Sequence, residues 1–235
     1  MIASYRFAGQ DEYCLRIDRG RDTRILVIQP LFEEANRTRH MLAEMMRALD
    51  GHGIDSLMPD LPGRNESAFP QHQADLDLWR NALAECAEQL GPVTHIAALR
   101  GGALLIDCAP QLPVWRLAPA KGEQLLRTMI RARLTADREA GKHVTEEMLI
   151  EAAQTGPVEL AGNLFGTAMI DGLKNARPED VLDIRRNSRT VRNSSEPDFV
   201  TGMIDGKALW LRAEPEHNAV MSQAIADDIA EWIRP

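Results

Sequence analysis

Short apolar runs alternate with segments of helical periodicity along the first half of the chain. Residues 24–30, RILVIQP, contain a β-rich apolar run, which is typical of a strand buried on both faces of a parallel sheet. Residues 36–53, NRTRHMLAEMMRALDGHG, carry apolar side chains near helical spacing until Gly51 and Gly53 interrupt the pattern, which predicts a helix. A strand, a loop and a helix are therefore expected in this order.

The same alternation extends on both sides of this unit. The pattern predicts two short strands at residues 4–7 and 13–17, a strand and turn at 54–63, an amphipathic helix at 74–91 and a strand at 93–99. Strands that alternate with helices in this way form a doubly wound α/β sheet. A single domain over residues 1–235 is expected, because α/β folds of this length often form one core.

The pattern changes between residue 119 and about residue 172. Helical segments follow one another over residues 122–154 with no intervening strand, which predicts an inserted helical lid at about 119–172. Two strands are expected at 179–186 and 207–213, separated by a polar loop at 187–198. The chain then ends in an amphipathic helix over residues 219–233.

The charge balance is acidic, with 27 Lys and Arg against 35 Asp and Glu and a formal net charge of −8. This balance argues against nucleic acid and anionic membranes as partners. Three cysteines without a CxxC pair suggest neither a disulfide framework nor a zinc site, and no HExxH, GxxxxGK[ST] or strand-linked GxGxxG motif occurs. No metal and no other cofactor is therefore expected. Without a signal-peptide pattern or a long apolar run, a cytoplasmic protein with no membrane insertion is expected.

The candidate site begins with residues 95–106, HIAALRGGALLI, where an apolar run breaks at Arg100 and two glycines. This pattern is typical of a strand that turns sharply into a helix, and in many hydrolases such a turn exposes a serine nucleophile. Centring the motif on Arg100 puts small residues two positions to either side; an alternative registration centres it on Leu99. Neither registration supplies Ser, Cys or Asp, and a guanidinium cannot be deprotonated to attack a carbonyl group. A conventional covalent acyl-enzyme is therefore not expected.

The order of elements and several motifs resemble a known superfamily. The segment DLPGRNES after one strand and the sharp turn after the next resemble the D-x-P-G-x-G-x-S and G-x-S-x-G motifs of the α/β-hydrolase superfamily. More narrowly, QPLFEEANRTRHM, DLPG, ALRGGALL and VELAGNLFG are similar to segments of the exosortase A system-associated hydrolase 2 family. The resemblance covers most of the chain, and LFEEANRTRHM and LRGGALL carry nearly all of its specificity. It implies an α/β-hydrolase-like, doubly wound, mostly parallel sheet with a helical lid insertion, and a hydrolase with a carrier-bound or envelope-related substrate.

Two hypotheses describe what Arg100 does. In the first, its guanidinium and the amides of Gly101 and Gly102 bind a carboxylate or phosphate at the start of the helix. In the second, Arg100 forms an internal salt bridge with Glu33 or Glu34, because a buried arginine needs a fixed partner. The two hypotheses are compatible if a ligand competes for the arginine.

The segment FEEANRTR directly follows a predicted buried strand, and ligands bind at the carboxyl edge of such a sheet. Glu33, Glu34 and Asn36 are candidates for binding substrate or positioning water, and Arg37 is a candidate for holding an anion. The alternative is that Asn36 or Thr38 caps the following helix while the arginines are solvated.

His217, in RAEPEHNAV, follows the last predicted strand, which is where an α/β-hydrolase keeps its catalytic histidine. It is a candidate base for activating water, and the alternative is a structural or exposed histidine. Asp183, in VLDIRR, falls near the strand that supplies the acid in this fold. Its plain alternative is a strand-end or solvent-facing carboxylate.

Three functions remain open from the sequence. The first is an atypical hydrolase of an acyl ester or thioester, with water positioned by Glu34, Asn36 or His217 and an anionic group held by Arg100. The second is a non-catalytic binding or scaffold protein of an exosortase or exopolysaccharide system, which the missing nucleophile favours. The third is a conventional esterase with a replacement serine elsewhere. The expected partner is a small-molecule or carrier-bound acyl substrate, and the sequence predicts no oligomeric state.

Overall fold

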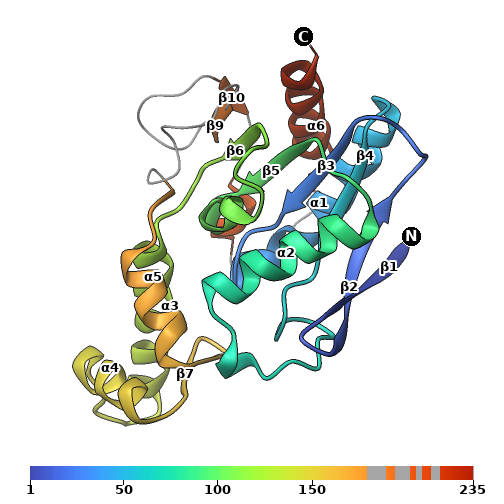
Figure 1. Cartoon of the computed structure of the whole chain (residues 1–235). Coiled ribbons are helices and arrows are strands. Elements are labelled where there is room, and N and C mark those ends of the chain that lie inside the picture. The colour runs from blue at the N-terminus through green and yellow to red at the C-terminus, as the bar shows by residue number, and fades with distance from the viewer. Residues whose placement is uncertain (179–188, 194–201, 205–207, 213–217, 235) are drawn as a thin grey trace.

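The computed structural model describes residues 1–178, 189–193, 202–204, 208–212 and 218–234. An eight-stranded sheet runs through its centre in the order β1-β2-β4-β3-β5-β6-β9-β10 (Figure 1). The strands are β1 (Ile2–Phe7), β2 (Gln10–Ile17), β3 (Arg24–Ile28), β4 (Asp55–Pro59), β5 (His95–Leu99), β6 (Val114–Leu117), β9 (Arg189–Asn193) and β10 (Gly202–Ile204). β2 is antiparallel to β1 and to β4, and all other neighbours are parallel. The predicted doubly wound, mostly parallel sheet is confirmed.

β3 shows why a continuous apolar run lies at the centre of this sheet. All five of its residues are buried, and alternate side chains enter the hydrophobic clusters on opposite faces. The helices α1 (Glu33–Gly51) and α6 (Ala219–Ile233) supply the cluster on one face. The helix α2 (Leu76–Leu90) and a 3-10 helix (Arg100–Cys108) contribute to the other, and Figure 1 shows α2 in front of the sheet. Helices on both faces remove both sets of strand side chains from water.

The segment inserted between β6 and β9 contains the helices α3 (Gly122–Glu139), α4 (Glu146–Thr155) and α5 (Thr167–Asn175). It also contains an antiparallel hairpin of β7 (Val158–Leu160) and β8 (Asn163–Phe165). The prediction of helices alone was therefore wrong for this part. Ala161 and Gly162 join the two strands at positive φ angles of 49° and 75°, the backbone geometry of a two-residue hairpin turn.

The last part of the chain departs from its sequence pattern. β9 lies within the segment predicted as a polar loop, because backbone hydrogen bonds to β6 and β10 satisfy it on both sides and Val191 is buried. Of the strand predicted at 207–213, the described residues contain a 3-10 turn at Leu209–Leu211 instead. The strand predicted at 179–186 lies outside the described residues. The predicted terminal helix is confirmed as α6.

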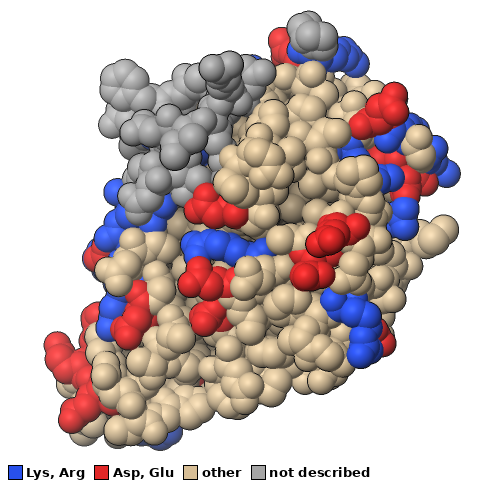
Figure 2. Space-filling model, in the orientation of Figure 1, with Lys and Arg blue, Asp and Glu red and all other residues tan. Residues whose placement is uncertain are grey.

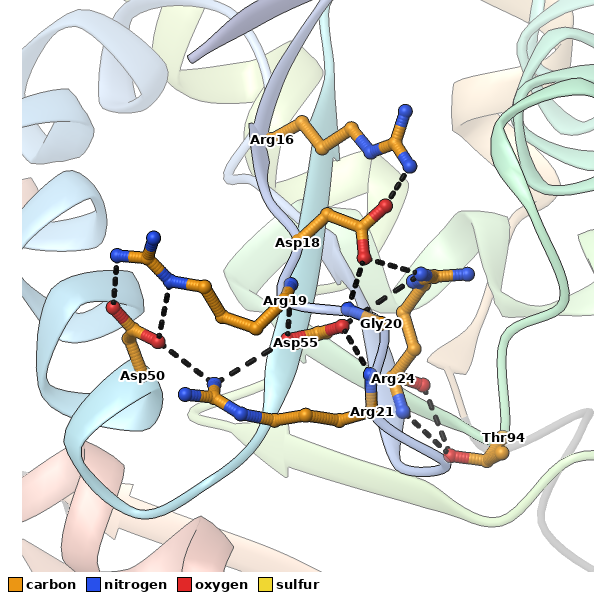
Figure 3. Close-up of polar contacts among 9 residues, drawn as sticks. All are labelled: Arg16, Asp18, Arg19, Gly20, Arg21, Arg24, Asp50, Asp55 and Thr94. Atoms are coloured by element: carbon orange, nitrogen blue, oxygen red, sulfur yellow. Dashed lines mark hydrogen bonds and ion pairs between the residues drawn. The ribbon is translucent and has the colours of Figure 1, made fainter.

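An ion-pair network holds the loop that precedes β3 (Figure 3). Asp55, the first residue of β4, is fully buried and accepts hydrogen bonds from the backbone N–H groups of Arg19 and Arg21, both at 3.0 Å. Arg24, the first residue of β3, pairs with Asp18 at 2.7 Å. These residues lie at or before the beginnings of β3 and β4, whereas the elbow turn follows the end of β5. In a parallel sheet the network and the elbow therefore lie at opposite edges.

A buried carboxyl group on β2, Glu12, is tied to the loop that contains the DLPGRNES motif. One oxygen of Glu12 accepts a 2.8 Å hydrogen bond from the Ser67 hydroxyl, and the other has no hydrogen-bond partner among the described residues. Burial raises the pKa of Glu12, and the charge of Asp60 raises it further, while the Ser67 hydrogen bond lowers it. The Ser67 oxygen also accepts from the Gly63 backbone at 2.8 Å. Ser67 therefore organises this loop.

Glu12→Gln is expected to raise stability at neutral pH and to flatten its dependence on pH. Because the folded-state pKa is raised, the stability that protonated Glu12 contributes is full below its ordinary pKa of 4.5 and is lost as the pH rises through the folded pKa. Thermal unfolding between about pH 4 and pH 8 measures this. Glu66→Gln, at an exposed position on the same loop, should behave as the wild type. A Glu12→Gln protein less stable than wild type at neutral pH would contradict the raised pKa.

Candidate functional site

The chain turns from β5 into the 3-10 helix at Arg100, whose φ angle of 52° lies in the left-handed region. Such an angle is uncommon for a non-glycine residue and marks a strained turn. A Cβ on Gly102 would lie 2.6 Å from the carbonyl oxygens of both Ile28 and Gln29, so only glycine allows the turn to approach the end of β3 this closely. The motif is therefore centred on Arg100, with Ala98 and Gly102 two positions to either side.

Arg100 is 5% exposed, and three other segments among the described residues contact it. Its Nε and Nη2 donate to the two carboxylate oxygens of Glu34 at 3.1 and 3.2 Å, and its Nη1 donates to the backbone oxygen of Ala118 at 2.9 Å. The guanidinium carbon lies 5.2 Å from the centre of the Trp210 ring, within cation–π range. Two hydrogen bonds to one carboxylate make a strong and directional ion pair. The structure thus contains the internal salt bridge, and its partner is Glu34 rather than Glu33.

Glu34 reaches the elbow because α1 begins directly after β3. Phe32, at a φ angle of 59°, precedes the first helical residue, Glu33. The Phe32 ring packs against Trp79 and Phe165 with centroid distances of 5.7 and 5.1 Å. This aromatic cluster fixes the direction in which the chain enters α1, and with it the position of Glu34.

The remaining residues of the FEEANRTR segment lie inside α1, which begins before the predicted start at residue 36. The proposed capping by Asn36 or Thr38 was wrong: Asn36 is exposed in the first turn, and the Thr38 hydroxyl donates to the Glu34 backbone oxygen at 2.7 Å within the helix. Arg37 is partly buried, and its Nη1 donates to the backbone oxygen of Trp210 at 3.2 Å. Arg37 and Arg100 therefore both contact Trp210.

A pocket of about 250 Å³ lies beside the elbow, between the loop after β3, the inserted helix α3 and the turn that carries Trp210. Among the described residues, its wall contains four charged residues (Glu33, Glu34, Arg37 and Arg100), two uncharged polar residues (Gln124 and Thr128) and the apolar residues Leu31, Phe32, Leu125, Met129, Ala132, Ala161, Trp210 and Leu211. A mostly apolar wall with a few converging polar groups is the common form of a small-molecule site.

The pocket brings together four of the predicted site residues. Asn36 is absent from its wall. Gly101 and Gly102 lie at the elbow, where a Cβ on Gly101 would be 2.6 Å from Cδ1 of Leu125. His217 and Asp183 lie outside the described residues.

Three further observations concern the surface charge, membrane-spanning helices and metal-ligating side chains. On the face shown in Figure 2, basic and acidic side chains of the described residues are interspersed and no continuous basic surface is visible. Within the part of the chain that the structure describes, no helix is long and apolar enough to span a membrane. In the same residues, His, Cys, Asp and Glu side chains do not gather in groups of three that could hold a metal ion.

Two partners of Arg100 carried no signal in the sequence. Trp210 falls in a segment predicted as a strand, and its ring covers Arg100 only because the described turn places it there. Ala118 contributes a backbone oxygen, at a positive φ angle of 45° directly after β6. Any residue type carries such an oxygen, so residue identity could not have revealed it.

Two of the segments that carry the family resemblance meet at the inserted hairpin. Arg64, from DLPGRNES, donates to the side-chain oxygen of Asn163, from VELAGNLFG. The Asn163 amide donates to the backbone oxygens of Leu160 and Ala161 at 3.2 and 2.8 Å. Because Ala161 lines the pocket, these contacts position part of the pocket wall.

No family model matches the chain, and no curated protein matches it. Solved structures do match. Est1E from Butyrivibrio proteoclasticus, with ferulic acid bound, is 13% identical, with a TM-score of 0.62 and coverage of 99% of this chain and 100% of its own. A bromoperoxidase from Bacillus anthracis is 14% identical, with a TM-score of 0.63 and coverage of 100% of both chains. The alpha/beta hydrolase domain-containing protein 10 from mouse is 10% identical, with a TM-score of 0.57 over 99% of this chain and 98% of its own.

Identities this low bear on the fold alone. The mostly parallel central sheet with helices on both faces matches these structures. This chain therefore has the α/β-hydrolase fold.

Proposed function

We propose that this chain is an atypical hydrolase of an acyl ester or thioester that forms no covalent acyl-enzyme. The observation that carries the proposal is Arg100 at the centre of the elbow, where hydrolases of this fold place their nucleophile. A guanidinium keeps its proton at neutral pH and cannot attack a carbonyl carbon. In the proposed reaction, water therefore attacks the acyl carbon directly.

Glu33 is the candidate base for that water. It lines the pocket, whereas both oxygens of the neighbouring Glu34 accept hydrogen bonds from Arg100. In the proposed step, Glu33 takes a proton from water while the water oxygen attacks the acyl carbon. The C–O or C–S bond then breaks, and Glu33 returns its proton to the oxygen or sulfur of the alcohol or thiol that leaves. Glu33 thus replaces Glu34 as the residue to which we assign the positioning of water.

The pocket wall favours an acyl chain as the bound group. Leu125, Met129 and Trp210 present apolar surface within a volume of about 250 Å³, and each CH₂ group buried against such surface contributes about 0.8 kcal/mol. The resemblance to the exosortase A system-associated hydrolase 2 family supports a carrier-bound or envelope-related acyl group. We infer a cytoplasmic location from the cysteine usage of the chain.

A second candidate function is a non-catalytic binding or scaffold protein of an exosortase or exopolysaccharide system. The bidentate pair of Arg100 and Glu34 favours it, because this pair commits two of the four charged groups in the described pocket wall to each other. A protein of this class would keep the pocket and bind the acyl group without turnover.

The expected result with a fluorophosphonate serine probe is no stoichiometric labelling, because the elbow holds no hydroxyl group. Wild type is expected to hydrolyse 4-nitrophenyl butyrate or a butyryl thioester slowly, and Glu33→Gln should lower the rate by about 100-fold, the smaller end of what a general base contributes. Release of 4-nitrophenol or thiol measures the rate.

Glu44→Gln, which makes the same change on α1 outside the pocket, should keep the wild-type rate. Stoichiometric labelling at one serine would overturn the noncovalent proposal. Saturable binding of the ester without turnover would select the second candidate function.

A further inference from the structure

The geometry points to a pocket that selects uncharged acyl ligands over carboxylates, because Glu34 already neutralises the arginine at the elbow. This inference rests on the proposed function and names the charge class of the ligand. It replaces the anion-binding role that the sequence suggested for Arg100.

The first argument is that the guanidinium of Arg100 is engaged. Three of its nitrogen atoms donate hydrogen bonds, two to Glu34 and one to the backbone of Ala118, and the Trp210 ring lies against it. A ligand carboxylate could reach the same bidentate position only by displacing Glu34. The displaced carboxylate, whose side chain is 14% exposed, would then lie beside a second anion and lose its two hydrogen bonds from Arg100.

The second argument concerns the charge of the whole pocket. Its described wall carries two acidic and two basic side chains, so their formal charges cancel. Glu33 and Arg37 lie one helical turn apart on the same face of α1, a spacing at which opposite charges attract. No excess positive charge in the described wall is left to compensate a bound anion.

The third argument is the cost of desolvation. Most of the wall is apolar, and burying a carboxylate against such surface without a new ion pair is strongly unfavourable. An amide or ester carbonyl loses far less on leaving water. The side-chain amide of Gln124, on the inserted helix α3, lies in the same wall and can donate a hydrogen bond to such a carbonyl.

The surroundings of the two elbow glycines agree with this inference. Gly102 closely faces the carbonyl oxygens of Ile28 and Gln29, which are acceptors and repel anions, and Gly101 faces Leu125. A hydrolase with this selectivity would bind its uncharged ester and release the carboxylate that it forms.

The test compares hexanamide with hexanoate, which have nearly the same shape and differ in charge at about pH 7.5. Titration of the wild-type protein, followed by NMR chemical shifts, should give a Kd for hexanamide at least about tenfold lower than for hexanoate. In Glu34→Gln, the released Arg100 should bind hexanoate about tenfold more tightly than wild type does, so that the preference narrows or reverses.

Glu33→Gln is the matched variant, because it removes the same charge from the same pocket without releasing Arg100. Its gain in hexanoate affinity should be clearly smaller than that of Glu34→Gln, and equal gains would show that the pair does not set the selectivity. If Glu34→Gln fails to fold, the comparison of hexanamide with hexanoate on the wild-type protein still tests the inference.

Two wild-type outcomes separate the inference from the function on which it rests. Hexanoate binding as tightly as hexanamide would overturn the inference while leaving an acyl-binding pocket. No saturable shift with either ligand would overturn the acyl-binding function itself, and the inference with it.

Discussion

Gly102→Ala is expected to destabilise the protein by about 3 kcal/mol, or roughly 6–12 °C in Tm. The added Cβ would lie 2.6 Å from two backbone oxygens at the end of β3, the buried central strand of the sheet. Backbone atoms cannot turn aside as a flexible side chain can, so the elbow or the strand has to shift. Thermal and denaturant unfolding measure the loss.

Gly51→Ala is the control for this prediction. Gly51 ends α1 without a positive φ angle, and no atom of the described residues lies within 4 Å of a Cβ built there. Alanine at that position should leave stability unchanged or slightly raised. A Gly102→Ala protein with the Tm of wild type would mean that the elbow does not approach β3 as closely as described.

Asp55→Ala is expected to cost about 3–5 kcal/mol, because it removes one partner from a buried ion-pair network. Asp55 is fully buried and accepts from two backbone N–H groups and from the side chain of Arg21 at 3.3 Å (Figure 3). Arg24, which is 8% exposed, lies 3.7 Å from the same carboxylate and would lose it as well. Unfolding by urea, compared with wild type, measures the change.

Asp50→Ala is the matched control, since Asp50 pairs with Arg19 and Arg21 at the surface side of the same network. Its side chain is 24% exposed, and ion pairs in contact with water contribute little. Its loss should therefore be much smaller than that of Asp55. Equal losses for the two variants would refute the claim that burial gives Asp55 its importance.

The elbow turn contributes both to the stability of the protein and to its proposed chemistry. Arg100 occupies a strained backbone position, and such positions persist when the surrounding structure over-determines them. Here the contacts come from α1, from the residue after β6 and from the turn at Trp210. Among the described residues, three segments thus hold the group at the centre of the elbow, and Glu33 is the acidic residue of the described pocket wall that is not paired with it.

Much of the fold was predictable because its elements carry clear periodicity. The apolar runs of β3 and β5 each indicated a strand, and the structure contains both strands. The apolar stripe along one side of α6 indicated the terminal helix. The sequence pattern predicted the secondary structure less well in segments that tertiary contacts stabilise. The sequence of β9 is mostly polar, yet the strand pairs with β6 on one side and β10 on the other. The strands β7 and β8 are short, so the helical pattern around them hid the hairpin that they form.

The candidate site was predictable in part. The sequence indicated that Arg100 lies at a sharp turn and that Glu33 or Glu34 comes near it, because both follow buried strands at the same edge of a parallel sheet. It left open which glutamate pairs with the arginine. The choice of Glu34 depends on where α1 begins, and that depends on the packing of Phe32 against Trp79 and Phe165.

The sequence by itself determined the alternation of strands and helices over the first 110 residues, the sharp turn and the absence of a nucleophile from it, since these depend on periodicity and residue type. Only the tertiary structure decided the partners of Arg100, the pocket beside it and the balance of charge in its wall. Those features arise where segments distant in the chain meet, as when Glu34, Ala118 and Trp210 converge on one guanidinium. Such contacts are set by packing of the whole core, and no local pattern encodes them.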